Sequence, residues 1–280
     1  IKNMIALMPS SFPKSTLKTK NIYKPKNKVI ARVILLTGCV QKVIAPQIND
    51  STINILNRHG VEVYVAKEAG CCGSLNHHLG KEDLAKQSFI RNINAWYDIC
   101  QKKPIDAILV NTSGCGTTLK DYGFIFENHP DKELSKRAKF ISELSKDITE
   151  YLGKNIKLNF TGNEKEHKIA YHSACSMQHG QKVHQQPLNL LKQSGNQILE
   201  IPDGHLCCGS AGTYNLLQGE MAKELLKRKV ENINKTSPDF IAAGNVGCIT
   251  QISTGTIIPI VHTIELLDWF TGGNKPREIK

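Results

Sequence analysis

The 280-residue sequence contains no apolar run near the roughly 20 residues that a membrane-spanning helix needs. Its opening apolar stretch, residues 4–8, is too short for the core of a secretory signal peptide. The sequence also lacks a P-loop, a G-x-G-x-x-G turn after a predicted strand, and a nucleophile–base motif. We therefore expect a soluble, cytoplasmic protein that makes no bond on a substrate by itself.

Acidic residues are missing from the first 32 positions, which hold eight of the chain's 36 basic residues. The rest of the chain has 28 basic against 25 acidic residues, so the net charge of +11 comes mainly from this segment. Because basic and acidic residues nearly balance in the rest of the chain, it lacks the excess of basic residues that is typical of nucleic-acid-binding proteins, and we expect no nucleic acid partner. Residues 1–28 are predicted to be a solvated basic linker or tail, with contact to an anionic membrane or an acidic partner as the alternative.

Cysteine is present in a repeated pattern. Nine cysteines without a secretory signal point to a reducing compartment, where thiols serve metals or redox chemistry. Eight of them form two sets related by a shift of 136 positions, or 133 for the last pair: Cys39, Cys71, Cys72 and Cys115, then Cys175, Cys207, Cys208 and Cys248. Cys100 has no counterpart and is predicted to be a buried small hydrophobe.

The same order of predicted elements surrounds each set of cysteines. Periodicity predicts strands at 33–36, 61–65 and 106–110 and helices at 45–59 and 81–99. The second half repeats them, with strands at 168–171, 197–201 and 239–243 and helices at 187–193 and 218–234. Alternating strands and helices imply parallel sheets. We therefore predict an α/β fold of two tandem Rossmann-like β-α-β-α-β cysteine-rich domains, at residues 29–160 and 166–280.

The repeated cysteines all follow the carboxyl ends of predicted strands, where open α/β sheets bind ligands. Each half is thus expected to gather four thiolates, and glycines at 70, 73 and 209 permit tight turns beside them. Zinc and iron–sulfur clusters both prefer thiolate ligands. Adjacent cysteines suit a larger cluster better than one tetrahedral ion, which favours iron–sulfur. Zinc, and disulfide redox chemistry at the vicinal pairs, remain alternatives.

These residues resemble the tandem CCG cysteine-rich domains of the heterodisulfide reductases and, more closely, of the glycolate oxidase (glycolate dehydrogenase) iron–sulfur subunit. The segments that carry the resemblance are 38–41, 71–80, 113–123, 171–180, 207–214, 245–249 and 262–268. The resemblance implies an electron-transfer subunit with iron–sulfur clusters, of the [4Fe–4S] type, on the eight repeated cysteines. It also implies FAD-containing partner subunits that oxidise glycolate, and quinone or a membrane surface on the acceptor side. The subunit would then be peripheral at the inner face of the cell membrane.

Two departures from the family pattern bear on function. A fifth cysteine, three residues after the last, is replaced by Thr118 in the first half and by Gln251 in the second. This counts against the disulfide-cleaving clusters of heterodisulfide reductase. No ferredoxin-like cysteine run precedes Cys39, so we expect the N-terminal domain of the glycolate oxidase subunit to be missing from this sequence. A lactate or heterodisulfide-type oxidoreductase component and a zinc-stabilised scaffold without redox function are the alternatives.

Five histidines lie in the family-like segments: His77, His78, His172, His179 and His262. Each is a candidate for donating a hydrogen bond to cluster sulfur or for acting as an extra ligand. The simpler interpretation is that each satisfies a local hydrogen bond.

Overall fold

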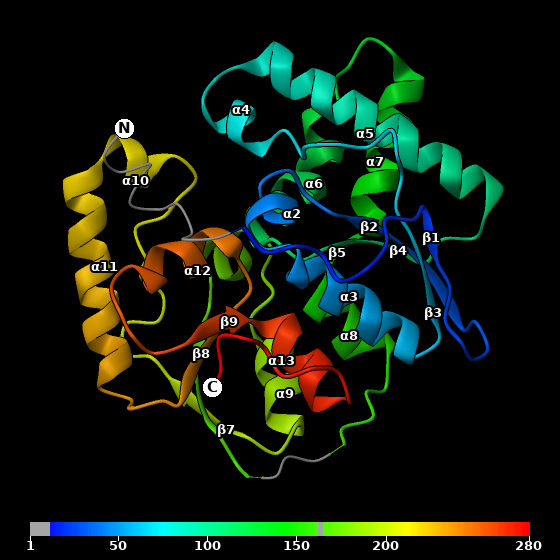
Figure 1. The fold of residues 1–280 in the computed structure, drawn as a ribbon. Helices are drawn as coiled ribbons and strands as arrows, with labels where there is room; N and C mark the ends of the chain where they lie inside the picture. The colour runs from blue at the N-terminus through cyan, green and yellow to red at the C-terminus, as the bar shows by residue number, and fades with distance from the viewer. Residues whose placement is uncertain (1–11, 162–164) are drawn as a thin grey trace.

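The computed structural model describes residues 12–161 and 165–280, which form two parallel-dominated sheets covered by helices (Figure 1). The strands of the first sheet are β1 (Ile22–Tyr23), β2 (Ala31–Leu36), β3 (Val61–Tyr64), β4 (Ala107–Val110) and β5 (Ser145–Asp147). Its helices are α2 (Gln41–Ile44), α3 (Gln47–Arg58), α4 (Ser74–His78), α5 (Glu82–Lys102), α6 (Ser113–Ile125), α7 (Lys132–Leu144) and α8 (Ile148–Asn155).

The second sheet repeats this arrangement with fewer elements. Its strands are β6 (Lys168–His172), β7 (Gln197–Glu200), β8 (Phe240–Ala243) and β9 (Ile260–His262). A short π-helix, η1 (Ser176–Gly180), follows β6. The helices are α9 (Gln185–Gln193), α10 (Tyr214–Leu217), α11 (Gly219–Asn234), α12 (Val246–Ser253) and α13 (Thr263–Phe270).

The two sheets have the same topology. The first runs β1-β3-β2-β4-β5 and the second β7-β6-β8-β9, so β3-β2-β4-β5 corresponds to β7-β6-β8-β9. Every pairing among the described strands is parallel except that of β1 with β3. The predicted α/β fold with two cysteine-rich repeats is confirmed. Each half continues past the predicted β-α-β-α-β unit to a fourth parallel strand, β5 or β9.

The central strands form because their residues are apolar on both faces. All four residues of β4 are buried, as are the last four of β2, which suits strands covered by helices on both sides. α5 packs one face on this sheet, with Phe89, Ile93 and Trp96 fully buried at three- or four-residue spacing. The order of strands reverses between β2 and β4, so the loops after them leave the same edge of the sheet, at the position where open α/β sheets bind ligands.

The described part of the predicted basic tail is attached to the first half. The Asp50 carboxylate accepts hydrogen bonds from the Ser15 hydroxyl at 2.7 Å and from the Thr16 backbone N–H at 2.6 Å. β1 then adds an antiparallel edge to β3. Ser15, Thr16 and the strand Ile22–Tyr23 are therefore attached to the first half, because a buried carboxylate and an open sheet edge both find partners there. Residues 1–11 lie outside the described residues.

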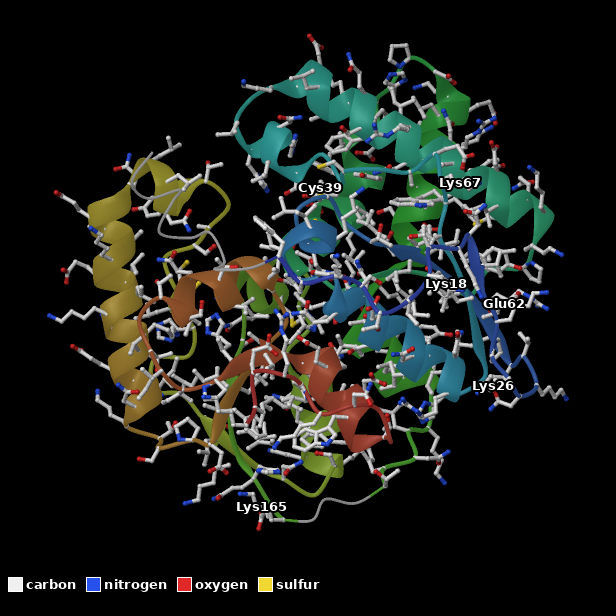
Figure 2. The ribbon with its side chains drawn as sticks, in the orientation of Figure 1. Lys18, Lys26, Cys39, Glu62, Lys67 and Lys165 are labelled. Atoms are coloured by element: carbon white, nitrogen blue, oxygen red, sulfur yellow. The ribbon has the colours of Figure 1, made fainter. Side chains whose placement is uncertain are left out.

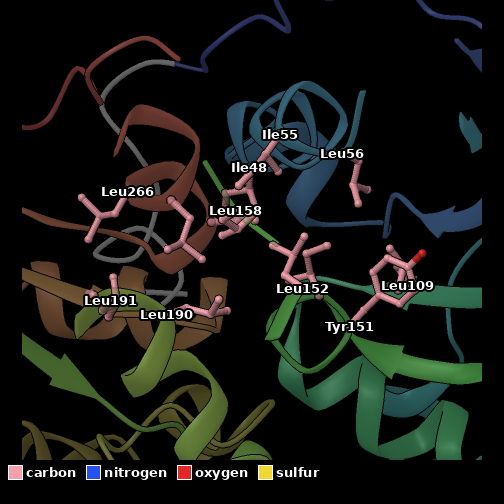
Figure 3. Close-up of a cluster of buried hydrophobic side chains, with 14 of the residues drawn as sticks. Ile48, Ile55, Leu56, Leu109, Tyr151, Leu152, Leu158, Leu190, Leu191 and Leu266 are labelled. Atoms are coloured by element: carbon pink, nitrogen blue, oxygen red, sulfur yellow. The ribbon is translucent and has the colours of Figure 1, made fainter. Parts of the chain in front are cut away.

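One hydrophobic core joins the two halves (Figure 3). It contains Ile55 of α3 and Leu152 of α8 from the first half, together with Leu190 of α9 and Leu266 of α13 from the second. α13 packs on α3, and α8 packs on α9. The predicted boundary between domains at 29–160 and 166–280 therefore passes beside a shared core, and the division into two domains stays a prediction.

Candidate metal centres

The first set of cysteines meets at the carboxyl edge of the first sheet. Cys39 follows β2 beside α2 (Figure 2), Cys71 and Cys72 end the loop after β3, and Cys115 lies in the first turn of α6, after β4. The Cys39 and Cys71 sulfurs are 3.5 Å apart, and those of Cys72 and Cys115 are 3.0 Å apart. These separations exceed the roughly 2.05 Å of a disulfide bond, and all the thiols are free.

The second set has the same placement in the second sheet. Cys175 follows β6, Cys207 and Cys208 follow β7, and Cys248 lies in the first turn of α12, after β8. Cys175 and Cys208 interact with Cys207, and Cys208 also interacts with Cys248, so the four thiols form one connected group. The structure thus gathers each predicted set from positions far apart in the sequence.

The Cys-Cys-Gly turn requires its glycine. Gly73 has φ +82° and Gly209 has φ +91°, in the left-handed region that glycine adopts most readily. A Cβ on Gly209 would lie 2.5 Å from the backbone oxygen of Ala222. In this conformation the glycine N–H groups donate to sulfur, Gly73 to Cys71 at 3.4 Å and Gly209 to Cys207 at 3.3 Å. The turn therefore presents both cysteines to one site and stabilises a thiolate on the first of them.

Two buried polar side chains hold the first Cys-Cys turn. Asn92 of α5, fully buried, donates to the Cys71 carbonyl at 2.9 Å and accepts from the Gly70 N–H at 2.8 Å. Tyr122 of α6 donates its hydroxyl proton to the Cys72 carbonyl at 2.8 Å. Neither residue is among those predicted from the sequence. Asn92 is marked in the sequence by a polar group at a helix position whose spacing marks the buried face, and Tyr122 by its place in the family-like segment 113–123.

Without a bound cation, the four sulfurs of a site do not all lose their protons. Hydrogen bonds from the Cys39 and Cys72 thiols hold the pKa of Cys71 far below the usual range, at about 2. The same contact with Cys71, with burial, raises the pKa of Cys39. Contact with Cys115 and Cys71, again with burial, raises the pKa of Cys72. Full ionisation of the four sulfurs therefore needs a positive charge among them, which a metal centre supplies.

The second site repeats this pattern. Hydrogen bonds from Cys175 and Cys208 lower the pKa of Cys207 to about 2, and the pKa of Cys175 is raised. Contact with Cys207 and Cys248, with burial, raises the pKa of Cys208. The pKa of Cys248 is lowered to about 5, chiefly by its contact with Cys208 and also by the neighbouring His172 ring.

A buried cation lies behind the second site. Lys229 of α11 is 2% exposed, and its ammonium donates to the carbonyls of Asp203 and Gly204 at 3.3 and 3.4 Å. Burial lowers its pKa, while the nearby thiols, Cys208 first, oppose that shift. Lys229 thus orders the loop that leads to the second Cys-Cys pair and places positive charge near its sulfurs.

The two sites are connected through Ser113, which lies two residues before Cys115. Its hydroxyl is 2.7 Å from that of Ser176, the neighbour of Cys175, and accepts from the Asn245 side chain, also at 2.7 Å. Asn245 caps α12, whose first turn carries Cys248. Ser113 is fully buried. Each of these two hydrogen bonds of Ser113, with a short chain segment on either side, therefore connects the two groups of thiols.

The remaining candidate residues fall into distinct places. Thr118 and Gln251 are buried and hydrogen-bonded, Thr118 to the Gly114 carbonyl and Gln251 to Asn215, so neither position adds a thiol. Cys100 is half-buried, packs against the first-half core, and has a pKa raised by burial to about 11. It takes no part in either group of cysteines.

Of the five candidate histidines, His172 is the one that joins a group of cysteines. Its ligand atom and those of Cys208 and Cys248 all lie within 4.8 Å of one another. His262 instead caps α13, where its Nδ1 accepts from the Ile264 N–H at 3.1 Å. The side chains of the other three, His77, His78 and His179, are exposed.

These features fit a thiolate-bound metal centre in each half. Four convergent thiols, amide N–H groups directed at sulfur, and glycine turns that allow close approach are the donor set that zinc and iron–sulfur clusters use.

The helices among the described residues include none long and apolar enough to cross a membrane.

The sequence is similar to those of known proteins, among them a subunit named as an iron–sulfur subunit. The chain is 34% identical over 261 residues to the glycolate oxidase iron–sulfur subunit of Escherichia coli, covering 92% of this chain and 62% of that protein. It is 24% identical over 243 residues to lactate utilization protein A of a Geobacillus species, covering 85% of this chain and 99% of the relative. The chain thus spans about three fifths of the length of the glycolate oxidase relative.

The fold and the repeated domain both have known counterparts. A crystal structure of a hypothetical protein from Helicobacter pylori superposes with a TM-score of 0.64, covering 99% of this chain and 54% of its own, at 10% identity, which shows a shared fold. The cysteine-rich domain family, CCG, matches residues 33–120 and 169–253, more than half of the chain. The chain therefore belongs to the CCG cysteine-rich domain family and carries two copies of that domain, one in each half.

Proposed function

We propose that the chain is the iron–sulfur, electron-transfer part of a glycolate dehydrogenase (glycolate oxidase) complex. The observation that carries the proposal is the pair of four-thiol sites joined through Ser113. The proposed ligands of the metal centres are Cys39, Cys71, Cys72 and Cys115 in the first site and Cys175, Cys207, Cys208 and Cys248 in the second. The glycolate oxidase relative supports the substrate class.

The chain's own residues would bind the clusters and set their potentials. A bound [4Fe–4S] cluster in each site would accept and release one electron at a time. The Gly73 and Gly209 N–H groups, directed at sulfur, and the buried Lys229 ammonium would stabilise the more negative, reduced state. The Ser113–Ser176 contact would keep the two sites close enough for electrons to pass between them.

The proposal assigns substrate chemistry to partner subunits. No serine, cysteine or histidine nucleophile with an adjacent base is part of the proposed role, and FAD-containing subunits would oxidise glycolate. Electrons would leave toward quinone, with the complex in the cytoplasm at the inner face of the membrane. Copurification of a flavoprotein with the tagged chain, and reduction of the iron centres by glycolate only when that flavoprotein is present, are the expected results.

A lactate-linked oxidoreductase is the second candidate. It is favoured by the lactate utilization relatives, one of which the chain covers over 99% of its length. The same copurified complex distinguishes the two candidates, because reduction of its iron centres by lactate and not by glycolate would replace the first proposal with the second.

The decisive test is the metal content of the anaerobically purified chain. We expect iron and acid-labile sulfide in nearly equal amounts and an electron paramagnetic resonance (EPR) signal after dithionite reduction. Zinc without sulfide would overturn the redox function and leave a zinc-stabilised scaffold.

Two cysteine variants locate the metal. Cys71→Ser should lose the iron and sulfide of the first site, roughly half the total, and should unfold more readily, because metal binding and folding are linked. Cys100→Ser is the matched control, a half-buried thiol outside both groups, and should keep full metal content. Equal iron in the two variants would contradict the proposed ligand set.

A further inference from the structure

His172 is a buried imidazole with no conventional partner. It ends β6, where its side chain is 1% exposed, and among the described residues neither ring nitrogen has a hydrogen bond of ordinary geometry, its contact being with the Cys248 thiol of the second site. A buried polar group that is left unpaired loses its hydrogen bonds to water without replacement and destabilises the fold. A histidine at this position is therefore destabilising unless something outside the polypeptide binds its ring.

The ring lies among the thiols of the second site. The ligand atoms of His172, Cys208 and Cys248 lie within 4.8 Å of one another, and all three residues are buried. Cys208 and Cys248 already belong to the second four-thiol group. A metal centre held by these sulfurs is within reach of an imidazole nitrogen, and imidazole and thiolate are ligands of the same metals, zinc and iron.

Among the residues that the structure describes, the first site has no such histidine. A shift of 136 positions relates His172 to Leu36, and sheet register agrees, since Leu36 pairs with Val110 of β4 and His172 with Ala243 of β8. Leu36 is buried in an apolar cluster. Two equivalent strand ends therefore deliver a leucine to one site and an imidazole to the other.

From this asymmetry we propose that His172 is a direct ligand of the metal centre in the second site. The two halves then hold different donor sets: four thiolates in the first, and in the second an imidazole that takes the place of one of the four proposed thiolates. This inference deepens the proposed function and rests on it for the identity of the metal. Exchange of thiolate for imidazole raises the potential of an iron–sulfur cluster, so the second site would be the better electron acceptor.

The experiment uses the full chain labelled with ¹⁵N-histidine, reduced with dithionite and examined by pulsed EPR. Direct ligation predicts a strong histidine-nitrogen hyperfine coupling that changes with the label and disappears in His172→Leu. That variant copies the residue of the first site. It should also show one cluster potential moved lower, toward that of the first site.

His59→Leu is the matched control. His59 is a buried histidine remote from both groups, with Nδ1 at 2.8 Å from the Ile55 carbonyl and Nε2 accepting from the Asn159 N–H at 3.1 Å. Its loss should lower stability but leave the nitrogen coupling and both potentials unchanged. If the labelled wild type shows only weak histidine coupling, as expected of an N–H···S hydrogen bond, His172 is not a ligand and the inference is overturned.

The result separates this inference from the function. Iron and sulfide without histidine coupling would defeat the inference and leave the electron-transfer proposal intact. Zinc without sulfide would defeat the function, and ligation would then be read from zinc X-ray absorption. A nitrogen scatterer lost in His172→Leu but kept in His59→Leu would support the inference, and spectra unchanged in both variants would overturn it.

Discussion

Gly209 illustrates how one residue controls the geometry of a site. Its φ of +91° lies in the region that costs a residue with a side chain about 1–2 kcal/mol, and its missing Cβ leaves room for the Ala222 carbonyl of α11. Because that oxygen belongs to helix backbone, it cannot move aside as a side chain tip does. Cys207 and Cys208 immediately precede this glycine, so any shift of the turn reaches both sulfurs.

We expect Gly209→Ala to be more harmful than Gly195→Ala. Gly195 has a similar φ of +79° but nothing within 4 Å of the added Cβ, so its variant measures backbone strain alone. The collision at Gly209 should add about 1–3 kcal/mol to the loss of unfolding free energy and reduce metal content in the second site. Denaturant unfolding and metal analysis of both variants provide the measurement. Equal losses of stability would show that close approach to Ala222 does not matter.

At this scale the sequence predicts the cysteines but not the residues that support them. The repeat spacing reveals each thiol, since all eight follow strand ends. Ser113 meets partners 63 and 132 positions away, and Asn92 reaches back 21 residues to Cys71, so local patterns carry no record of these contacts. Such pairs become visible only when the fold brings distant segments together.

The elements are predictable in proportion to their apolar patterning. β2, β3 and β4, and their counterparts β6, β7 and β8, consist of apolar or alternating runs and lie where the sequence predicts them. β5 has the sequence Ser-Lys-Asp and is not predicted, because it is short and polar, and only pairing with β4 makes it a strand. β9 escapes prediction because it has only three residues, directly after Pro259.

The N-terminus of α13 contains a buried carboxyl group that couples this element to pH. Glu265 accepts from the His262 N–H at 3.1 Å and is 5% exposed. Burial, with the nearby Glu278 carboxylate, raises its pKa from 4.5 to about 8. The folded state therefore binds this proton more tightly than the unfolded state. Its stabilising effect is complete below about pH 4.5 and is lost as pH rises through 8.

We predict that Glu265→Gln removes this dependence. The unfolding free energy of the wild type, relative to that of the variant, should fall as pH rises from about 5 to about 8, with a slope approaching 1.4 kcal/mol per pH unit for one proton. Taking the difference cancels the opposite effect of the metal-binding thiols, which need deprotonation. Chemical denaturation of both proteins across this range provides the measurement, and a constant difference would contradict the raised pKa.

At the scale of the whole molecule, the two halves share a hydrophobic core, and they also touch where the two thiol sites approach each other. Leu152 of α8 is fully buried in the cluster that also holds Leu190 and Leu266 from the second half. Separating the halves would expose this apolar surface to water, at about 25 cal/mol for each Å². Apart from this core, α6 packs against η1, and the Ser113–Ser176 contact lies between these two elements. Folding and the proximity of the two sites are therefore linked.

This shared core predicts one cooperative unfolding transition, which the chain's two tryptophans can report. Trp96 is fully buried in the first half, and Trp269 packs against the second-half part of the shared core. Fluorescence of Trp269→Phe then follows the first half, and that of Trp96→Phe follows the second. Each substitution carries its own stability cost, so circular dichroism is recorded on the same samples. In each variant we expect the fluorescence and circular dichroism transitions to coincide.

Leu152→Ala strengthens the test. This substitution should lower the unfolding free energy by about 2–5 kcal/mol at the shared core, and should therefore lower the unfolding midpoint in both tryptophan variants. Leu134→Ala is the control for a leucine buried only in the first-half cluster, and under cooperative unfolding it too should lower both midpoints. If the halves instead unfold separately, Leu134→Ala will move only the Trp96 transition. The Trp269 signal would then remain at its original midpoint, and each half would hold its site without the other.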